Sequence, residues 1–228
     1  MHNEMLHHPA IPVPLRNFLR SHGQPLAAPL AELETSARDR DVPIIPHETV
    51  DYFQTWFRQV HPTSVLELGT AIGFSALLFS HLMGSQGKVT TIERAPVMID
   101  HARANLDQYD HHHQITMLTG DATDILSTLT DTYDVAFMDS AKAQYIHQLP
   151  AVLARVKVGG TVFIDDVLQG GTVFSPETEI PHRLKGIHRN LRQLLDSVFA
   201  EPDLTATLIP LGDGLLMMTK NADKAYHF

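Results

Sequence analysis

Cysteine is absent from the 228 residues of this chain, and its absence closes several chemical routes. Without it there is no disulfide, no zinc–thiolate site and no cysteine nucleophile, which favours a reducing compartment. No apolar run approaches the ~20 residues that a membrane-spanning helix needs. The first thirty residues lack a basic start followed by an apolar run, and Pro9, Pro12 and Pro14 interrupt them. We therefore expect no signal peptide and a cytoplasmic protein.

Positive charge is also scarce, since 17 Lys and Arg stand against 26 Asp and Glu, a formal charge of −9. A strongly acidic chain does not attract nucleic acid through its overall field, so only a local basic patch could bind one. One basic stretch exists, with its cations at Arg183, Lys185, Arg189 and Arg192. An amphipathic helix with a solvated basic face would look the same. The length and the 43% hydrophobic content suit one globular domain, with or without a small N-terminal extension.

Short apolar runs alternate with helical patterns along most of the chain, which predicts a parallel α/β sheet with helices on both faces. Strands are expected at residues 64–68, 88–93, 115–119, 133–139, 161–165, 205–211 and 215–220. The last two flank a tight turn with two glycines, so the seven-stranded sheet should end in an antiparallel hairpin. Helices are expected at residues 26–40, 47–60, 74–83, 96–109, 145–155 and 181–199, with another ending at residue 129.

Three aspartates stand where two of the predicted strands end. Asp139 follows one apolar run, and Asp165 and Asp166 follow the next. Strand carboxyl ends face the ligand crevice of an open α/β sheet, and three carboxylates there suit a hard cation such as Mg²⁺. Asp165 or Asp166 alone could equally cap the following loop. Lys142 is a candidate base if the cleft is partly dry, or an ordinary surface lysine.

A glycine loop follows the first predicted strand, in the run Glu67-Leu68-Gly69-Thr70-Ala71-Ile72-Gly73. Glycine lets the backbone turn tightly and approach a ligand closely, although two glycines at such a place are often only a turn. Glu93 ends the second strand, where an acid can accept ribose hydroxyl protons. It could also be a solvated strand end. Gly120 and Ala122 follow the third strand, where small residues leave room for a flat base.

Together these motifs resemble the class I S-adenosylmethionine-dependent O-methyltransferases. The resemblance covers residues 42–228 and is carried by the runs VLELGTAIGFSALL, TIER, GDA, FMDSAKAQY and FIDDVL. The nearer group is cation-dependent and includes catechol and caffeoyl-CoA O-methyltransferases. Within it, DVPIIP, VLQGG and LIPLGDGLLMMTK resemble bacterial tRNA 5-hydroxyuridine methyltransferases. The resemblance implies a Rossmann-like methyltransferase domain over residues 42–228, preceded by an N-terminal arm and helix over residues 1–41.

The resemblance also implies roles for individual residues. Those implied for the cofactor, from its methionine end to its adenine, are Asp139, Glu67, Gly69, Ser75, Glu93 and Ala122, with Ile45 as a cover. Those implied for Mg²⁺ or Mn²⁺ are Asp139, Asp165 and Asp166, with Lys142 as the base beside Tyr145. The family usually has Asn at the position of Asp166, and an extra carboxylate would reduce the acidifying power of the metal.

The expected function is metal-dependent methyl transfer from S-adenosylmethionine to the 5-hydroxyl of 5-hydroxyuridine at the tRNA wobble position, by a homodimer. The alternative is a small-molecule phenolic O-methyltransferase of the catechol or caffeoyl-CoA type. Both substrates offer two neighbouring oxygens. A non-catalytic S-adenosylmethionine-binding protein is the third interpretation, and the intact acids and Lys142 argue against it.

Overall fold

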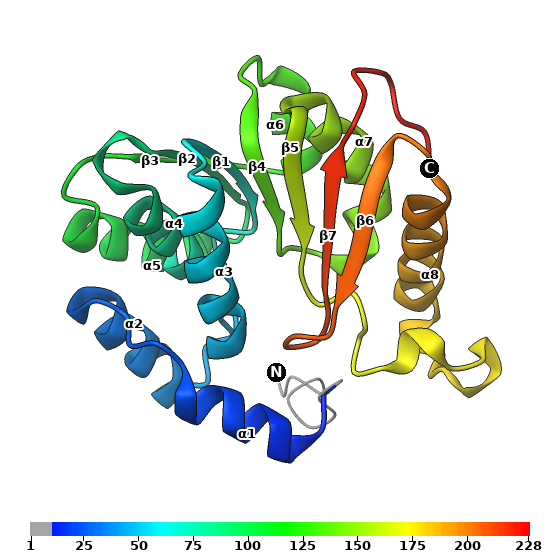
Figure 1. Ribbon diagram of the computed structural model, residues 1–228, viewed down its shortest axis with the longest axis horizontal. Helices are drawn as coiled ribbons and strands as arrows, with labels where there is room; N and C mark the ends of the chain where they lie inside the picture. Colours follow the sequence, from blue (N-terminus) through cyan, green and yellow to red (C-terminus); the bar gives the residue numbers. More distant parts are fainter. Residues whose placement is uncertain (1–10) are drawn as a thin grey trace.

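The computed structural model describes residues 11–228, and within them seven strands form one sheet with helices on both faces (Figure 1). The strands are β1 Ser64–Leu68, β2 Lys88–Glu93, β3 Ile115–Thr119, β4 Tyr133–Met138, β5 Val156–Ile164, β6 Leu204–Ile209 and β7 Leu215–Lys220. Their order is β3-β2-β1-β4-β5-β7-β6, and β7 runs antiparallel to both of its neighbours. The predicted Rossmann-like sheet with a C-terminal antiparallel hairpin is confirmed.

The helices of the described part cover both faces of this sheet. They are α1 Val13–His22, α2 Ala28–Asp39, α3 His47–Val60, α4 Phe74–Met83, α5 Pro96–Tyr109, α6 Ala122–Thr128, α7 Tyr145–Arg155 and α8 Lys185–Ala200. Short 3-10 turns are η2 Gly84–Gln86, η3 Lys142–Gln144, η4 Thr172–Phe174, η5 Glu177–Glu179 and η6 His182–Leu184. The helix predicted at residues 181–199 is therefore preceded by η6. The strand predicted from residue 161 begins at Val156, because two glycines inside it hid the pattern.

The strand order places a topological switch point between β1 and β4. The chain proceeds from β1 outward to β3, then returns to β4 on the other side of β1. Ligands of open α/β sheets bind outside the carboxyl ends of the strands at such a point. The register pairs Ile164 of β5 with Leu216 of β7, so the turn before β7 lies at the same edge of the sheet.

Alternate residues of the central strands are buried on opposite faces of the sheet. Val65 and Phe137 pack in the core beside α2, α3 and α4, whereas Leu66 and Met138 pack in the core beside α6, α7 and α8. The scarce aromatic residues concentrate in the first of these cores. The ring of Phe53 makes T-shaped contacts with those of Phe79, Phe137 and Phe163, at centroid distances of 5.1–5.5 Å. These two cores hold the strand ends, and hence the candidate site, in place.

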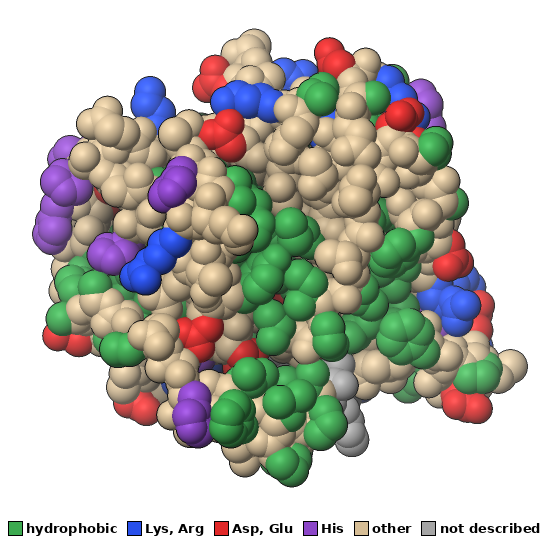
Figure 2. All heavy atoms as spheres, in the orientation of Figure 1, with side chains coloured by type: hydrophobic (Ala, Val, Ile, Leu, Met, Phe, Trp, Pro, Cys, Tyr) green, Lys and Arg blue, Asp and Glu red, His purple; other side chains and the backbone are tan. Residues whose placement is uncertain are grey.

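Helix α1 differs from the others because none of its residues is buried. It exposes Val13, Leu15 and Phe18, and an ion pair of 2.8 Å between Arg20 and Glu48 joins it to α3. Figure 2 shows further hydrophobic side chains across the centre and the lower part of the face in view. The predicted homodimer could cover such surface and stays a prediction.

Two other expectations concern the whole chain. No helix within residues 11–228 combines the length and the apolar character needed to cross a bilayer. The expected cytoplasmic location stays a prediction. So does the boundary after residue 41, and residues 1–10 of the predicted arm lie outside the described residues.

Asp134 joins three segments at the amino end of the sheet. Its Oδ2 accepts hydrogen bonds from the backbone N–H and hydroxyl groups of Thr63 and Ser64 at 2.8–3.1 Å, and its Oδ1 lies 2.6 Å from Lys157 Nζ. Partial burial raises the pKa of Asp134, but the hydrogen bonds from Lys157 and Thr63 outweigh it and hold the pKa well below its usual range. This stabilisation is present above the unfolded pKa of ~3.9 and is lost as the pH falls below it.

We therefore expect Asp134→Asn to lower the free energy of unfolding at pH 7 by about 1–3 kcal/mol. At pH 3 the difference from the unmutated protein should shrink. Urea unfolding at the two pH values measures both quantities. Asp131→Asn, at an exposed acid of the preceding loop, serves as the control and should change stability by less than about 0.5 kcal/mol. A loss of equal size at both pH values would contradict the ionic role of Asp134.

Candidate active site

A cavity of about 300 Å³ opens at the carboxyl ends of β1 to β4. Four of the residues predicted for the cofactor line it, namely Gly69, Glu93, Ala122 and Asp139. The remaining lining residues are Ala71, Ile92, Arg94, Gly120, Asp121, Ser140, Ala141, Gln144 and Gln148. The cavity therefore lies at the switch point, where the fold predicts a ligand.

Gly69 marks the place where β1 and β4 separate. Its φ is 99°, and a Cβ there would collide with the carbonyl oxygen of Asp139. Its N–H donates to Ile92 O at 3.0 Å, while the N–H of Asp139 donates to Leu68 O at 2.9 Å. Glycine is required because the backbone is both left-handed and too close to the next strand for a side chain.

Glu93 ends β2 and holds the glycine loop against that strand. Its Oε2 accepts a hydrogen bond from Ala71 N at 2.9 Å, and its Oε1 accepts from the N–H groups of Arg94 and Ala95 at 2.9 and 2.8 Å. Each carboxylate oxygen has about two acceptor positions. These contacts leave Oε2 with one position for a ligand hydroxyl.

Three other residues predicted for the cofactor, Glu67, Ser75 and Ile45, do not line the cavity. Glu67 is fully buried, and Thr91 donates a hydrogen bond to its carboxylate. Burial raises the pKa of Glu67 to about 7, although hydrogen bonds from Ser75 and Thr91 oppose the rise. Ser75 is the second residue of α4, after the glycine loop, and Ile45 is buried in the core beside α2 and α3. Glu67 and Ser75 are therefore linked to each other next to the glycine loop, whereas Ile45 lies in the core.

The sequence interpretation assigned no role to five polar residues of the wall, namely Arg94, Asp121, Ser140, Gln144 and Gln148. Arg94 forms an ion pair of 3.1 Å with Asp121 across the rim, from the end of β2 to the end of β3. Its position directly after Glu93 could have indicated it. Gln148 lies on α7 four residues after Gln144. Helical spacing places these two glutamines on one face, which was the available signal.

Asp139, Asp165 and Asp166 come together beside this cavity, as the strand ends predicted. Burial raises the pKa of Asp139 to about 7, the charge of Asp166 adds to the rise, and Lys142 opposes it. Burial also raises the pKa of Asp165 well above its usual range, with contributions from Asp166 and Asp139. The three carboxyl groups are therefore near enough to repel one another.

Lys142 lies between two of the carboxylates at this edge. Its Nζ is 2.9 Å from Asp166 Oδ2 and 3.7 Å from Asp213 Oδ2, and its side chain is 15% exposed. Sequence reasoning treated Asp213 only as part of a turn. The predicted hairpin could have placed Asp213 at this edge, because β7 pairs antiparallel with β5 and must begin where β5 ends. Burial raises the pKa of Asp213 to about 6, with Asp166 adding to the rise.

The predicted metal ligands Asp139, Asp165 and Asp166 lie at the same edge of the sheet, but their side chains are not arranged to coordinate one metal ion. Within residues 11–228, no group of three or more Asp, Glu or His side chains is arranged to hold a metal ion. The carboxylate of Asp166 pairs with Lys142, and Asp165 Oδ1 accepts the N–H of Asp166 at 2.8 Å. The donors are all oxygen, which is the chemistry that Mg²⁺ prefers. The metal set stays a prediction.

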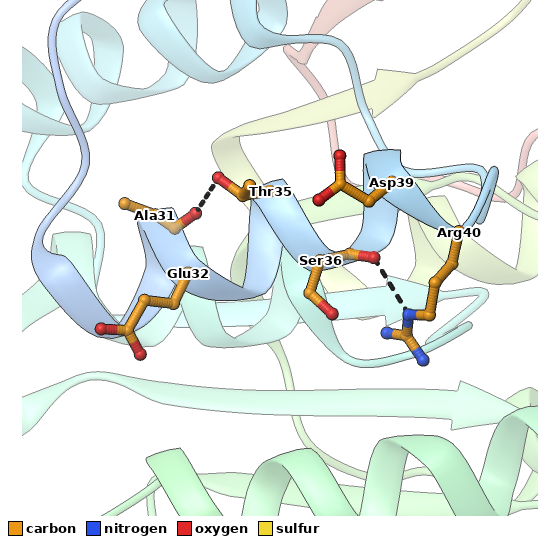
Figure 3. Close-up of a pocket in the computed structure, with 6 residues that line it drawn as sticks. All are labelled: Ala31, Glu32, Thr35, Ser36, Asp39 and Arg40. Carbon is orange, nitrogen blue, oxygen red and sulfur yellow. Dashed lines mark hydrogen bonds between the residues drawn. The ribbon is translucent and has the colours of Figure 1, made fainter.

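A second hollow, of about 470 Å³, lies on the outer side of α2 (Figure 3). All of its lining residues come from this one helix and its end, namely Ala31, Glu32, Thr35, Ser36, Asp39 and Arg40. Thr35 and Arg40 donate hydrogen bonds back to the helix backbone at 2.9 and 3.0 Å. This hollow is larger than the cavity at the switch point, but no residue of a strand end lines it. The cavity at the carboxyl ends of the strands is therefore the better candidate for the active site.

The sheet order and the switch-point cavity define a Rossmann-like methyltransferase fold. The chain belongs to the O-methyltransferase family, whose model matches residues 27–221. The prediction that the chain is an O-methyltransferase is confirmed at the level of this family.

Individual relatives agree with this membership. A caffeoyl-CoA O-methyltransferase of Stellaria longipes is 27% identical over 164 residues, which are 69% of this chain and 68% of that protein. A Staphylococcus aureus protein, provisionally named a caffeoyl-CoA O-methyltransferase, is 27% identical with a TM-score of 0.84 over 91% of this chain and 99% of its own. The SAH-bound methyltransferase of Podospora anserina shares the fold, with 19% identity and a TM-score of 0.82 over 97% of each chain.

Proposed function

We propose that the chain methylates a phenolic hydroxyl of a small molecule, with S-adenosylmethionine as the methyl donor. The observation that carries this proposal is the cluster of four carboxylates around one lysine, directly beside the switch-point cavity. The caffeoyl-CoA O-methyltransferases among the relatives support the substrate class. An acidic chain does not attract tRNA through its overall field, whereas a small phenol needs no such attraction.

The switch-point cavity is the part of the site that would hold the methyl donor, and it is suited to a cationic ligand. S-adenosylmethionine supplies an electrophilic methyl group on a positively charged sulfur. Glu93, Asp121 and Asp139 line the cavity against the single cation Arg94, so the lining is acidic overall. The open acceptor position on Glu93 Oε2 fits a ribose hydroxyl, and Ala122 leaves room for a flat base. The SAH-bound Podospora anserina methyltransferase of the same fold supports the choice of cofactor.

The acceptor side of the site, around Lys142 and the neighbouring aspartates, must remove a proton from the phenol, because a neutral phenol is a poor nucleophile. Lys142 Nζ is the proposed proton acceptor at this edge. Only a neutral amine accepts a proton, so an ammonium at this place would first have to lose its proton to water. The contacts with Asp166 and Asp213 hold Nζ in place, and a fixed orientation between reacting groups lowers the barrier by itself.

A divalent cation is the further component that we propose for this side. Asp139, Asp165 and Asp166 are the residues that would hold Mg²⁺ or Mn²⁺, after Asp166 turns away from Lys142. Bound there, the cation would acidify the acceptor hydroxyl. The closeness of these acids supports this role, since the charge of Asp166 adds to the raised pKa values of Asp139 and Asp165 and a bound cation would relieve that repulsion.

The tRNA wobble base is the second candidate acceptor, and the basic stretch before and along α8 favours it. This segment lies close to the acceptor side, because Asn190 Nδ2 donates to Ala143 O in η3 at 2.8 Å. Part of its charge is used within the protein. Arg189 pairs with Glu177 at 3.2 Å, and Arg192 donates to Val173 O at 3.4 Å. At the right of Figure 2, where Figure 1 places α8 and the segment before it, Lys and Arg side chains lie beside Asp and Glu side chains.

A comparison of acceptors separates the two candidates. Labelled S-adenosylmethionine is incubated with a catechol panel or with bulk tRNA, using the unmutated protein and the double variant Lys185→Gln, Arg189→Gln. We expect catechol methylation by both proteins and none of tRNA. If tRNA is methylated instead, the double variant should flatten its salt dependence by about 0.7–0.9 log units per lost phosphate contact. That outcome would replace the phenol with tRNA as the substrate.

The proposed ribose contact gives a prediction for Glu93. We expect Glu93→Gln to weaken S-adenosylmethionine binding roughly 10- to 100-fold, because a charged hydrogen-bond acceptor contributes about 1.5–3 kcal/mol. Glutamine keeps one oxygen for the glycine loop, so the fold should survive. Calorimetry measures the affinity, with Asp100→Asn on the exposed side of α5 as the control. Unchanged affinity would remove Glu93 from the cofactor site.

A further inference from the structure

Asp213 is a buried carboxylate to which the proposed chemistry gives no necessary role. It lies in the turn between β6 and β7 and is only 7% exposed. Its neighbours Gly212 and Gly214 have φ values of 55° and 89°, which glycine adopts most readily. Burying a carboxylate is unfavourable unless it is paired or hydrogen-bonded. The partners of Asp213 therefore indicate what it does.

One oxygen of Asp213 holds the segment that follows β5. Its Oδ1 accepts the N–H of Gly170 at 2.6 Å. The backbone of the same turn adds two hydrogen bonds, from Leu168 N to Asp213 O at 2.9 Å and from Val167 N to Gly214 O at 3.1 Å. The turn and the segment after Asp166 thus form one unit at the carboxyl edge of the sheet.

The other oxygen points to the lysine of the acceptor side. Asp213 Oδ2 is buried without a hydrogen-bond partner, and it forms an ion pair with Lys142 Nζ at 3.7 Å. The same Nζ lies 2.9 Å from Asp166 Oδ2. The ammonium is therefore held between carboxylates from two different elements. A lysine side chain is flexible, so two such partners restrict its position.

We propose that Asp213 is a positioning residue for Lys142. It draws the ammonium toward the β6–β7 turn, while its hydrogen bond to Gly170 keeps that turn against the end of β5. Lys142 is thereby held over the strand ends where the acceptor oxygen would lie. The inference rests on the proposed function only in that it gives Lys142 a part in the acceptor chemistry.

The position of Lys142 can be measured without any substrate. We expect Asp213→Asn to raise the acetylation rate of Lys142 by a water-soluble amine reagent roughly 3- to 30-fold, relative to the exposed Lys88 of the same sample. Asparagine keeps an oxygen for Gly170 but removes the charge. Peptide mass spectrometry reads the labelling, and circular dichroism checks the fold. Asp196→Asn, at an exposed acid of α8, is the control and should leave the rate unchanged.

A double-mutant cycle then asks whether Asp213 acts through Lys142. We expect Asp213→Asn to lower kcat roughly 3- to 30-fold with little change in the KM for S-adenosylmethionine. In the background of Lys142→Met it should have no further effect, because its target is gone.

The outcomes of the two arms are distinct. An unchanged labelling rate of Lys142 in Asp213→Asn, with the fold intact, overturns the proposal. An equal fall of kcat in both backgrounds also overturns it, since Asp213 would then act independently of Lys142. If the unmutated protein methylates no acceptor, the proposed function fails, and the labelling arm alone still decides whether Asp213 positions Lys142.

Discussion

Replacement of Lys142 by Met should lower kcat by about 10²–10⁴-fold, the usual contribution of a general base. The effect on the KM of the acceptor should be smaller, because a base acts mainly in the transition state. The structural reason is that Lys142 Nζ is the one cationic group within 4 Å of Asp166 and Asp213, among the described ion pairs of this edge. Steady-state kinetics at saturating S-adenosylmethionine measures the change.

Lys142→Arg is the matched variant for this prediction. Arginine keeps the positive charge but does not lose its proton in proteins. We therefore expect it to be about as inactive as Lys142→Met. Near-normal turnover with arginine would show that the charge of Lys142 is sufficient, and that another group or water takes the proton.

Removal of divalent cations should abolish turnover. The expected loss is complete within detection after treatment with EDTA, and Mg²⁺ or Mn²⁺ in excess should restore the activity. The reason is the close grouping of Asp139, Asp165 and Asp166, for which Lys142 is the one cation among their described interactions within residues 11–228. Asp139→Asn should give the largest loss among these acids, because Asp139 also lines the cofactor cavity.

Binding of S-adenosylmethionine supplies the control for cation removal. Calorimetry in EDTA should show that the cofactor still binds, since Glu93 and the glycine loop do not depend on the metal. Full turnover in the chelator would instead mean that the carboxylates serve Lys142 and not a cation. That result would agree with the ion pair of Asp166 and with the absence of a metal-holding group within residues 11–228.

The fold was predictable because its signals are local. The apolar runs and the turns between them located all seven strands of the described sheet, and two strand ends located Asp139 and Asp165. The details that failed have physical causes. The glycines inside β5 hid its first half, and Pro181 introduced a 3-10 turn before α8.

The candidate site was predictable only where a residue stands at a strand end. Glu93, Ala122 and Asp139 line the cavity because the sheet geometry places them there. Asp213 comes from a turn 74 residues after Asp139 (213 − 139), and the antiparallel register of β7 brings it to Lys142. The ion pair between Lys142 and Asp166 depends on side-chain orientation, which no sequence pattern gives.

The most direct test of the proposed function is the mass of the product. The protein is incubated with Mg²⁺, a catechol and S-adenosylmethionine that carries a trideuterated methyl group, and the acceptor is analysed by fragmentation mass spectrometry. We predict one trideuterated methyl group on a hydroxyl oxygen, and no such product with Lys142→Met at the same time point. A protein that binds S-adenosylmethionine but labels no oxygen of any catechol would contradict the account.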